Sequence, residues 1–352
     1  MSVGIRLEHV SKRFDHSVKG EVYAVREVSL SVEDGQLVTL LGPSGCGKST
    51  TLRMIAGFEE PDAGAILIDG RDVTHVLPNR RGIGFVFQNY ALFPHLSVFE
   101  NVAYGLRVQG RDERAIVQAV GTVLDLVGLA GYERQQPHQL SGGEQQRVAL
   151  ARAVVFEPKV LLFDEPLSNL DAKLRLEMRE QIRALQKRIG ITTVYVTHDQ
   201  EEAMAISDRI AVMDRGSVVQ EGSARDLYYR PRTEFVARFI GRTNVLKARV
   251  LSSSQVETEG MSIAFASGRQ PGDMMSLVVR PEMIALRAGG GPGPNGRIVQ
   301  VTFLGEKTDY QVAFGGTMLQ VVMSGLASAA LQPDTAVTID FNVDGFHILE
   351  QD

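Results

Sequence analysis

Short apolar runs and longer helical patterns alternate over the first 240 residues, which is typical of an α/β protein with a mainly parallel sheet. Between two of the runs, four apolar residues recur every three or four positions. They predict a helix that ends before Gly190, since glycine is favoured just past a helix C-terminus. The four residues are Met178, Ile182, Leu185 and Ile189. The runs that predict strands are residues 25–32, 36–41, 160–163 and 192–197.

The pattern changes after about residue 240, where apolar and polar residues alternate in short runs separated by turn residues. Such runs predict a small all-β domain, either a sandwich or a barrel of the OB type. We therefore divide the chain into residues 1–240, an α/β domain, and residues 241–352, a β-rich domain, with a glycine-rich turn at residues 289–296. The alternating apolar residues are Val299, Val301 and Phe303, then Tyr310, Val312 and Phe314, then Leu319, Val321 and Met323, and then Val337, Ile339 and Phe341.

Composition and charge narrow the possible partners. The 352 residues suffice for two domains with their own cores, and 44% hydrophobic with 22% charged residues is ordinary for a globular protein. The net charge of −5 argues against a nucleic-acid partner, which usually binds a basic surplus. No run approaches the ~18 apolar residues of a membrane-spanning helix. The single cysteine, Cys46, excludes an internal disulfide.

A phosphate-binding loop is predicted at residues 42–50, whose sequence GPSGCGKST follows an apolar strand and fits G-x-x-x-x-G-K-S/T. The glycines let the backbone curl until its N–H groups point at phosphate oxygens. Lys48 brings a positive charge to the β- and γ-phosphates, and the Ser49 hydroxyl can ligate Mg²⁺. Cys46 is interpreted as a small tolerated side chain whose alkylation or oxidation would abolish activity. The predicted nucleotide-binding residues here are Gly42, Pro43, Ser44, Gly45, Cys46, Gly47, Lys48, Ser49 and Thr50.

Two carboxylates, Asp164 and Glu165, directly follow the predicted strand at residues 160–163. Asp164 is predicted to hold Mg²⁺ through water, and Glu165 to polarise the attacking water. Two acids at a strand end more often belong to a solvated loop, but the phosphate loop upstream favours the catalytic interpretation.

The segment LSGGE at residues 140–144 has two interpretations. Ser141 and Glu144 have the spacing of a capping box, so the segment could simply begin a helix. Alternatively it binds phosphate, because Gly142 and Gly143 leave the N–H groups of the helix N-terminus open to an anion.

The order of these segments resembles the ABC ATPase family, from Val3 to about Gly241. LSGGE follows the phosphate loop, and then come VLLFDEP at residues 160–166, SNLD at 168–171 and VTHD at 196–199. The resemblance implies an ABC-type nucleotide-binding domain with a RecA-like core and a helical subdomain at about residues 90–155. It also implies binding of ATP and Mg²⁺ and hydrolysis of ATP.

The resemblance implies roles for the matching residues, and it implies that two copies pair head to tail. Gln88 would reach the metal and the attacking water. His198 would contact the γ-phosphate and hold Glu165 in place, and Asp171 would cross the dimer interface to couple the two sites. The residues that would complete the partner copy's nucleotide site are Ser141, Gly142, Gly143 and Glu144.

Two aromatic residues compete for the stacking position on adenine. Phe14, in SKRF, matches the stacking aromatic of the family. The segment of residues 15–22 is longer than the corresponding segment in many relatives, so Tyr23 could stack on adenine instead. We favour Phe14; simple core packing is the remaining alternative.

Among ABC proteins, the chain resembles the ATPases of binding-protein-dependent importers. It lacks the long coiled coil or zinc module of DNA-repair members, the second cassette of translation-associated members and the fused membrane domain common in exporters. Its tail resembles the TOBE-type β domain of the importer group. The resembling segments are residues 80–106, 167–175 and 197–204 in the first domain, and 239–244, 279–286 and 296–312 at the junction and in the tail.

In this importer group the segment around residues 88–104 lines a groove that receives a short cytoplasmic helix of the permease. Apolar side chains suit that role. Packing within the helical subdomain is the equally weighted alternative for each of them. The residues concerned are Tyr90, Leu92, Phe93, Leu96 and Phe99.

The importer resemblance implies three partners: a second copy of the chain, transmembrane permease subunits and, indirectly, an extracytoplasmic solute-binding protein. The chain would lie peripherally at the cytoplasmic face of the cell membrane. The expected cargo is ferric iron, a polyamine or aminoethylphosphonate, with ferric iron favoured. A sugar or sulfate importer, or a non-transport ABC ATPase, is the alternative. The role of the β domain and the make-up of the permease stay open.

Overall fold

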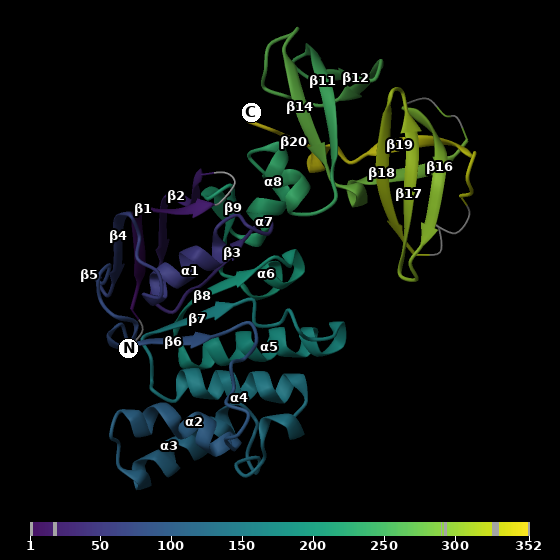
Figure 1. The fold of residues 1–352 in the computed structure, drawn as a ribbon. Coiled ribbons are helices and arrows are strands. Elements are labelled where there is room, and N and C mark those ends of the chain that lie inside the picture. Colours follow the sequence, from purple (N-terminus) through teal and green to yellow (C-terminus); the bar gives the residue numbers. More distant parts are fainter. Residues whose placement is uncertain (1–2, 17–19, 290, 292–293, 326–330, 351–352) are drawn as a thin grey trace. The chain divides into compact units, whose positions relative to one another are not determined.

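The computed structural model describes residues 3–16, 20–289, 291, 294–325 and 331–350. By its contacts the chain divides into two compact units, residues 1–224 and 225–352. Figure 1 shows that the first unit combines helices and sheets and that the second is built mostly of strands. Over the described ranges, no helix combines the length and the apolar content needed to cross a membrane.

A six-stranded sheet forms the centre of the first unit, in the strand order β10-β9-β3-β8-β7-β6. Five strands run parallel, and only β10 is antiparallel to its neighbour. Every residue of β3, β7 and β8 is buried, which explains their nearly continuous apolar sequence and confirms these three predicted strands. The bounds are β3 (Leu37–Leu41), β6 (Ile83–Val86), β7 (Val160–Asp164), β8 (Thr192–Thr197), β9 (Arg209–Asp214) and β10 (Ser217–Gly222).

A second, antiparallel sheet in the order β2-β1-β4-β5 shares one hydrophobic core with helix α1 (Lys48–Ala56) and the parallel sheet. Ile5, Leu40, Leu52 and Ile66 are among its fully buried members. The helix therefore lies between the two sheets, and its first turn follows the end of β3. The strands are β1 (Ile5–His16), β2 (Gly20–Val32), β4 (Ala63–Ile68) and β5 (Arg71–Asp72).

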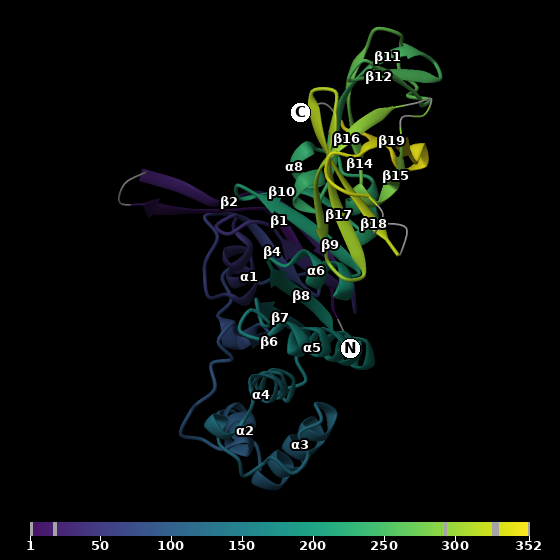
Figure 2. The ribbon, with the colours of Figure 1, turned by 90° about the vertical axis from the view of Figure 1, so that its right-hand side faces the viewer.

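Helices cover the other face of the parallel sheet (Figures 1 and 2). The predicted helix is α5 (Ala172–Ile189), and it ends as expected, with Gly190 in the left-handed conformation at φ 62°. Of its four predicted apolar residues, three are buried, and only the last, Ile189, is exposed. The remaining helices are α2 (Val98–Val108), α3 (Glu113–Leu126) and α4 (Gly142–Val154), all within the range predicted for a helical subdomain, and α6 (Gln200–Ile206).

The second unit contains two five-stranded antiparallel sheets that enclose one core, as the alternating pattern predicts. Most of the predicted apolar residues are buried, but in β16 the prediction is wrong. Val299 and Phe303 are 50% and 72% exposed. Val299 lies at a bulge that follows the buried Ile298, and Phe303 is the last residue of the strand. The strands are β11 (Asn244–Ser252), β12 (Gln255–Thr258), β13 (Met261–Ala264), β14 (Met274–Val279), β15 (Ile284–Ala288), β16 (Asn295–Phe303), β17 (Lys307–Phe314), β18 (Thr317–Ser324), β19 (Ala336–Phe341) and β20 (His347–Ile348).

Two short helices precede these sheets, α7 (Ala224–Tyr229) and α8 (Glu234–Phe239). Arg280, 2% exposed, fastens them to the β unit. Its guanidinium donates to the carbonyls of Tyr228, Ala237 and Arg242, at 2.6 to 3.0 Å, and stacks on the Tyr228 ring at 4.0 Å. The compact unit therefore begins near residue 225, whereas the domain boundary at residue 240 rests on the sequence pattern and stays a prediction.

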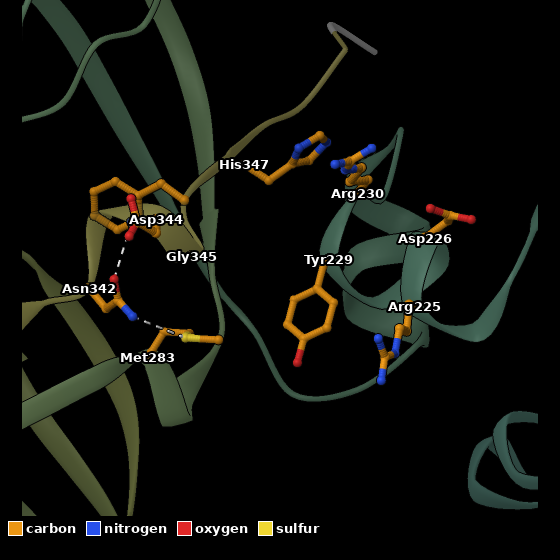
Figure 3. A pocket seen from close by; sticks show the side chains of 10 residues that line it. Arg225, Asp226, Tyr229, Arg230, Met283, Asn342, Asp344, Gly345 and His347 are labelled. Carbon is orange, nitrogen blue, oxygen red and sulfur yellow. Dashed lines mark hydrogen bonds between the residues drawn. The ribbon is translucent and has the colours of Figure 1, made fainter.

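The second unit also holds an open hollow of about 610 Å³, lined by α7 and the segment 342–347 (Figure 3). Two arginines, Arg225 and Arg230, and two aspartates, Asp226 and Asp344, balance the charge of its lining. All of its lining residues belong to the second unit, whereas every residue predicted to bind nucleotide belongs to the first.

Candidate nucleotide site

The phosphate loop connects the end of β3 to α1, and two of its glycines are required by close approaches of the backbone. A Cβ atom on Gly42 would lie 2.4 Å from the Met213 carbonyl oxygen. Gly47 has φ 102°, and a Cβ atom there would lie 2.2 Å from the Ala24 carbonyl oxygen. No larger residue fits at either position without moving the backbone.

Lys48 is held within this loop. It is 5% exposed, and its Nζ donates to the carbonyl oxygens of Gly42 and Pro43 at 2.8 and 2.9 Å. The helix that Lys48 begins has no side-chain cap, since its N-cap is Gly47. The N–H groups of its first turn therefore suit an anion, which the helix dipole also favours. Ser44 and Gly45 lie exposed at the tip of the loop, and Thr50 is partly exposed in the first turn.

Two oxygen ligands of the kind that Mg²⁺ prefers lie side by side. Ser49 Oγ, in the first turn of α1, donates to Asp164 Oδ1, at the end of β7, at 2.7 Å. The parallel arrangement of β3 and β7 brings both segments to one edge of the sheet. A hydroxyl beside a carboxylate fits Mg²⁺, which binds proteins through one or two oxygen ligands and keeps several waters.

Glu165 and His198, 33 residues apart in sequence, are in contact. His198 Nδ1 lies 3.0 Å from Glu165 Oε2, and the Glu165 side chain is 20% exposed. Glu165 adopts the left-handed conformation, at φ 45°, and its N–H donates to the Val196 carbonyl oxygen. An unusual backbone at the end of a buried strand is typical of functional sites. The predicted pairing of these two residues is thus present in the structure.

Gln88 reaches the same region through the SNLD segment. Gln88 Nε2 donates to Ser168 Oγ at 3.3 Å, and Ser168 Oγ donates to the Glu165 carbonyl oxygen at 3.0 Å. Asn169 Nδ2 donates to the Gln88 carbonyl oxygen at 3.0 Å. Sequence reasoning assigned only Asp171 in SNLD and missed Ser168 and Asn169 as the supports of Gln88. The motif was visible, but the direction of these side chains was not.

A cluster of polar side chains that the sequence analysis also missed holds the loop that carries His198 through Asp199. Asp199 accepts from Arg179 Nη2 at 2.9 Å, and its other oxygen caps α6. Arg175 lies 3.6 Å from the same carboxylate. Nearby, Glu202 accepts from Thr197 and Tyr195, and burial raises the pKa of its carboxyl group. The cluster limits how far the His198 loop can move.

The LSGGE segment does not reach the phosphate loop within one copy of the chain. Ser141 caps α4, with both arms of the capping box to Glu144 present, as the sequence predicts. Figures 1 and 2 both show α5 and the parallel sheet between α4 and α1. A Cβ atom on Gly143 would lie 2.8 Å from Leu174 Cδ1, while Gly142 stays partly exposed. Asp171 caps the neighbouring α5 by accepting from the Leu174 N–H at 2.9 Å.

The two candidate adenine-stacking residues project from opposite faces of the β1–β2 hairpin. Phe14 pairs with Val22, and the adjacent Arg13 pairs with Tyr23. Directly paired residues share a face and consecutive residues alternate, so Phe14 and Tyr23 point to opposite sides. Their exposed fractions, 44% and 42%, do not distinguish them. At most one of them can stack on a given nucleotide.

A phosphate loop joined to an adjacent carboxylate pair, a histidine and a distant LSGGE helix defines the ATP-binding cassette class of protein. The chain belongs to the ABC transporter family: residues 25–168 match the family model "ABC transporter", and residues 277–349 match "TOBE domain". It is an ATP-hydrolysing subunit of the import group.

Particular relatives extend over the whole chain. The "Fe(3+) ions import ATP-binding protein FbpC" of Rhizobium etli is 46% identical over 351 residues, 98% of this chain and 97% of that protein. The "Spermidine/putrescine import ATP-binding protein PotA" of Frankia alni is 50% identical over 337 residues, 90% of this chain and 72% of that protein.

A solved structure described as the dimeric, post-hydrolysis state of the ATP-binding cassette MJ0796 bound to ADP and Pi is similar with a TM-score of 0.56 at 32% identity. The match covers 62% of this chain and 98% of that one.

Proposed function

We propose that the chain energises a binding-protein-dependent importer of ferric iron by hydrolysing ATP between two copies of itself, at the cytoplasmic face of the cell membrane. The observation that carries the proposal is the separation within one copy. The Ser49–Asp164 pair and the Glu165–His198 pair meet at one end of the sheet, while the LSGGE helix lies beyond α5.

The nucleotide phosphates would be bound by the N–H groups at the start of α1 and by Lys48. Ser49, Asp164 and Gln88 would hold Mg²⁺, since two of the three already lie in hydrogen-bond contact. Bound Mg²⁺ would neutralise charge that develops on the γ-phosphate. Lys48 would contribute because its ammonium donates to two loop carbonyls, and its remaining proton meets only a weak acceptor, Cys46 Sγ at 3.9 Å, which a phosphate oxygen can replace.

Glu165 would take the proton of the attacking water, and His198 would hold its carboxylate and contact the γ-phosphate. The 3.0 Å contact between them and the anchored His198 loop support these roles. Water held against the γ-phosphate by Glu165 on one side attacks in line with the leaving oxygen. Gln88, supported by Ser168 and Asn169, would orient that water.

The second copy would supply Ser141, Gly142, Gly143 and Glu144 to the site, and Asp171 would lie at the interface between copies. Partial exposure of Gly142 at the N-terminus of α4 supports this, because a helix N-terminus is open there to an anion. The dimeric state of the similar MJ0796 cassette, bound to ADP and Pi, is a further support.

The substitution Glu165→Gln tests the pairing, because it keeps the shape of the side chain and removes the base. We expect the variant to accumulate as an ATP-bound dimer in size-exclusion chromatography with light scattering. The control is Glu165→Gln combined with Lys48→Ala, which should stay monomeric because it cannot retain ATP. A monomeric Glu165→Gln protein at saturating ATP would contradict the proposal.

The cargo is proposed from the relatives, because the ATPase itself does not touch it. Relatives named for Fe(3+) import and for spermidine/putrescine import match over most of this chain at 44% to 50% identity. We favour ferric iron and keep a polyamine as the second candidate. Proteoliposomes with the chain, its permease and its solute-binding protein should take up radiolabelled ferric iron on addition of ATP. Uptake of spermidine and not of iron would change the cargo assignment from ferric iron to a polyamine.

A further inference from the structure

We propose that Arg152 is a positioning residue that couples helix α4 to the segment after Gln88, by holding two consecutive residues, Tyr90 and Ala91, in the left-handed conformation. The inference rests on the proposed function in one respect, that this segment passes the state of the nucleotide site to a permease.

Tyr90 and Ala91 have an unusual backbone. Their φ angles are 61° and 47°, and neither is glycine. A side chain makes the left-handed region unfavourable because the Cβ atom crowds the following carbonyl oxygen, and two such residues in succession are rare. The pair therefore persists only where surrounding contacts hold it. Tyr90 itself is 7% exposed and joins the core, so of the two interpretations for this residue, packing is the one the structure supports.

The N–H groups of Tyr90 and Ala91 donate to the nearby carbonyls of Phe87 and Asn89, and the side-chain hydrogen bonds to the carbonyls of the pair come from Arg152. Arg152, in the last turn of α4, donates from Nη1 to the Ala91 carbonyl oxygen at 2.7 Å and from Nη2 to the Tyr90 carbonyl oxygen at 2.8 Å. Its guanidinium also lies 5.8 Å from the centre of the Phe93 ring. A planar fork with fixed donors suits two adjacent carbonyls, and hydrogen bonds from a charged donor are strong. Arg152 thus opposes the relaxation of both residues at once.

Other side-chain anchors fix the ends of the segment and leave the two carbonyls of the left-handed pair to Arg152. Asn169 donates to the Gln88 carbonyl oxygen at 3.0 Å. Asn101, fully buried on α2, donates to the carbonyls of Phe93 and Leu96 and accepts from the Phe93 N–H at 2.8 Å. Between these anchors, the described hydrogen bonds to the two carbonyl oxygens come from Arg152.

The LSGGE segment lies at the other end of the same helix, α4. Ser141 caps α4, and Arg152 lies eleven residues later in its last turn. A helix moves as a rigid element, so a displacement of its N-terminus by a nucleotide is passed to Arg152 and from there to residues 90 and 91. Those residues stand between Gln88, in the nucleotide site, and Phe93, on the segment proposed for the permease. Arg152 is the link that makes the two ends of this path move together.

The test first removes the Arg152 hydrogen bonds and then relieves the backbone strain that they oppose. Arg152→Met keeps a long unbranched side chain without the donors, and we expect the binding-protein-stimulated ATPase of the reconstituted importer to fall about tenfold. The KM for ATP should change little, because the phosphate loop is untouched. Ala91→Gly alone should behave as the unmodified protein. The double variant Arg152→Met/Ala91→Gly should regain most of the stimulated activity, since glycine adopts φ 47° without the Cβ penalty.

The matched control is Arg114→Met, an exposed arginine of the helical region whose loss should leave stimulation unchanged. Arg152→Lys repeats the experiment with a single donor group if the methionine variant does not fold, and it should also be rescued by Ala91→Gly. Stimulation of Arg152→Met equal to that of Arg114→Met, or no rescue by glycine, would overturn the inference. Absence of stimulation in the unmodified importer would instead contradict the proposed function.

Discussion

Two cations are almost equally buried in the two units, yet they do different things. Lys48 in the phosphate loop is 5% exposed and Arg280 in the β unit is 2% exposed. Both donate to backbone carbonyls, Lys48 to two of its own loop and Arg280 to four in α7, α8 and the segment between α8 and β11. Burial of a charge is therefore not in itself a sign of function.

What separates the two is the state of the groups around them. The donors of the Arg280 guanidinium are engaged on three sides, and its planar shape fills the space between α7, α8 and β14. Lys48 lies beside uncapped N–H groups at the start of α1, and an ammonium is a compact charge that can be shared with an incoming anion. A site is recognised by donors that still lack an acceptor.

The largest expected effect is at Lys48. Lys48→Ala removes a charge aimed at the β- and γ-phosphates, so kcat/KM for ATP should fall by on the order of 10³-fold or more, to an undetectable level. Thermal stability should fall by less than for Arg280→Met, because Lys48 supports two loop carbonyls, of which that of Pro43 lies on a partly exposed residue. Phosphate release and a melting curve measure the two quantities, and Lys247→Ala, an exposed lysine of the β unit, is the control. Unchanged ATPase activity of Lys48→Ala would refute the site assignment.

Arg280→Met should lower stability and leave the ATPase activity intact, the opposite of what is expected for Lys48→Ala. It leaves buried carbonyls on the segments of Tyr228 and Ala237 without donors, so the second unit should lose about 3 kcal/mol of stability. Turnover of ATP by the first unit should persist. Urea denaturation followed by fluorescence of the tyrosines, alongside ATPase assays, separates the two. Arg287→Met, at an exposed ion pair with Asp340, is the control and should shift nothing measurable.

Comparison of the two units also shows what could be predicted from the sequence. The phosphate loop and Asp164-Glu165 were predicted from short local strings of residue types that the chemistry demands, and His198 from the resemblance to the ABC ATPase family. The structure brings these residues to one end of the sheet, and their roles stay predictions. The β3, β7 and β8 strands were predictable because burial on both faces leaves them apolar.

The features that could not be predicted depend on long-range contacts and local bulges, which hydrophobic periodicity does not encode. Arg152 bonds to residues about sixty positions earlier, and Arg179 holds a loop on another element. In β16, a bulge after Ile298 leaves Val299 exposed where simple alternation placed it inside, and Phe303 is exposed at the end of the strand. Arg280 joins α7 and α8 to the β unit, which a change of pattern near residue 240 could not reveal.

A smaller effect is expected at the β1–β2 hairpin, where Phe14 and Tyr23 lie on opposite faces and only one of them can stack on adenine. Phe14→Ala should weaken ATP binding about tenfold, the size of one lost stacking interaction of ~1–3 kcal/mol. Tyr23→Ala should leave it unchanged. Calorimetric titration with ATP on both variants decides the matter, and each variant is the control of the other. A loss confined to Tyr23→Ala would transfer the adenine contact to that residue.

The smallest expected effect of a substitution is at Cys46, which shares the loop with Lys48 and is 3% exposed. Burial raises the pKa of its thiol, against a weaker lowering influence of Lys48 3.9 Å away. Since the thiolate is the reactive form, iodoacetamide should modify Cys46 more slowly than free glutathione at pH 7. The rate should rise about tenfold per pH unit until the raised pKa is reached. Cys46→Ala should retain turnover, because the thiol only fills space. Complete alkylation should abolish turnover, because an added group would displace Lys48, and full activity afterwards would contradict that reading of the loop.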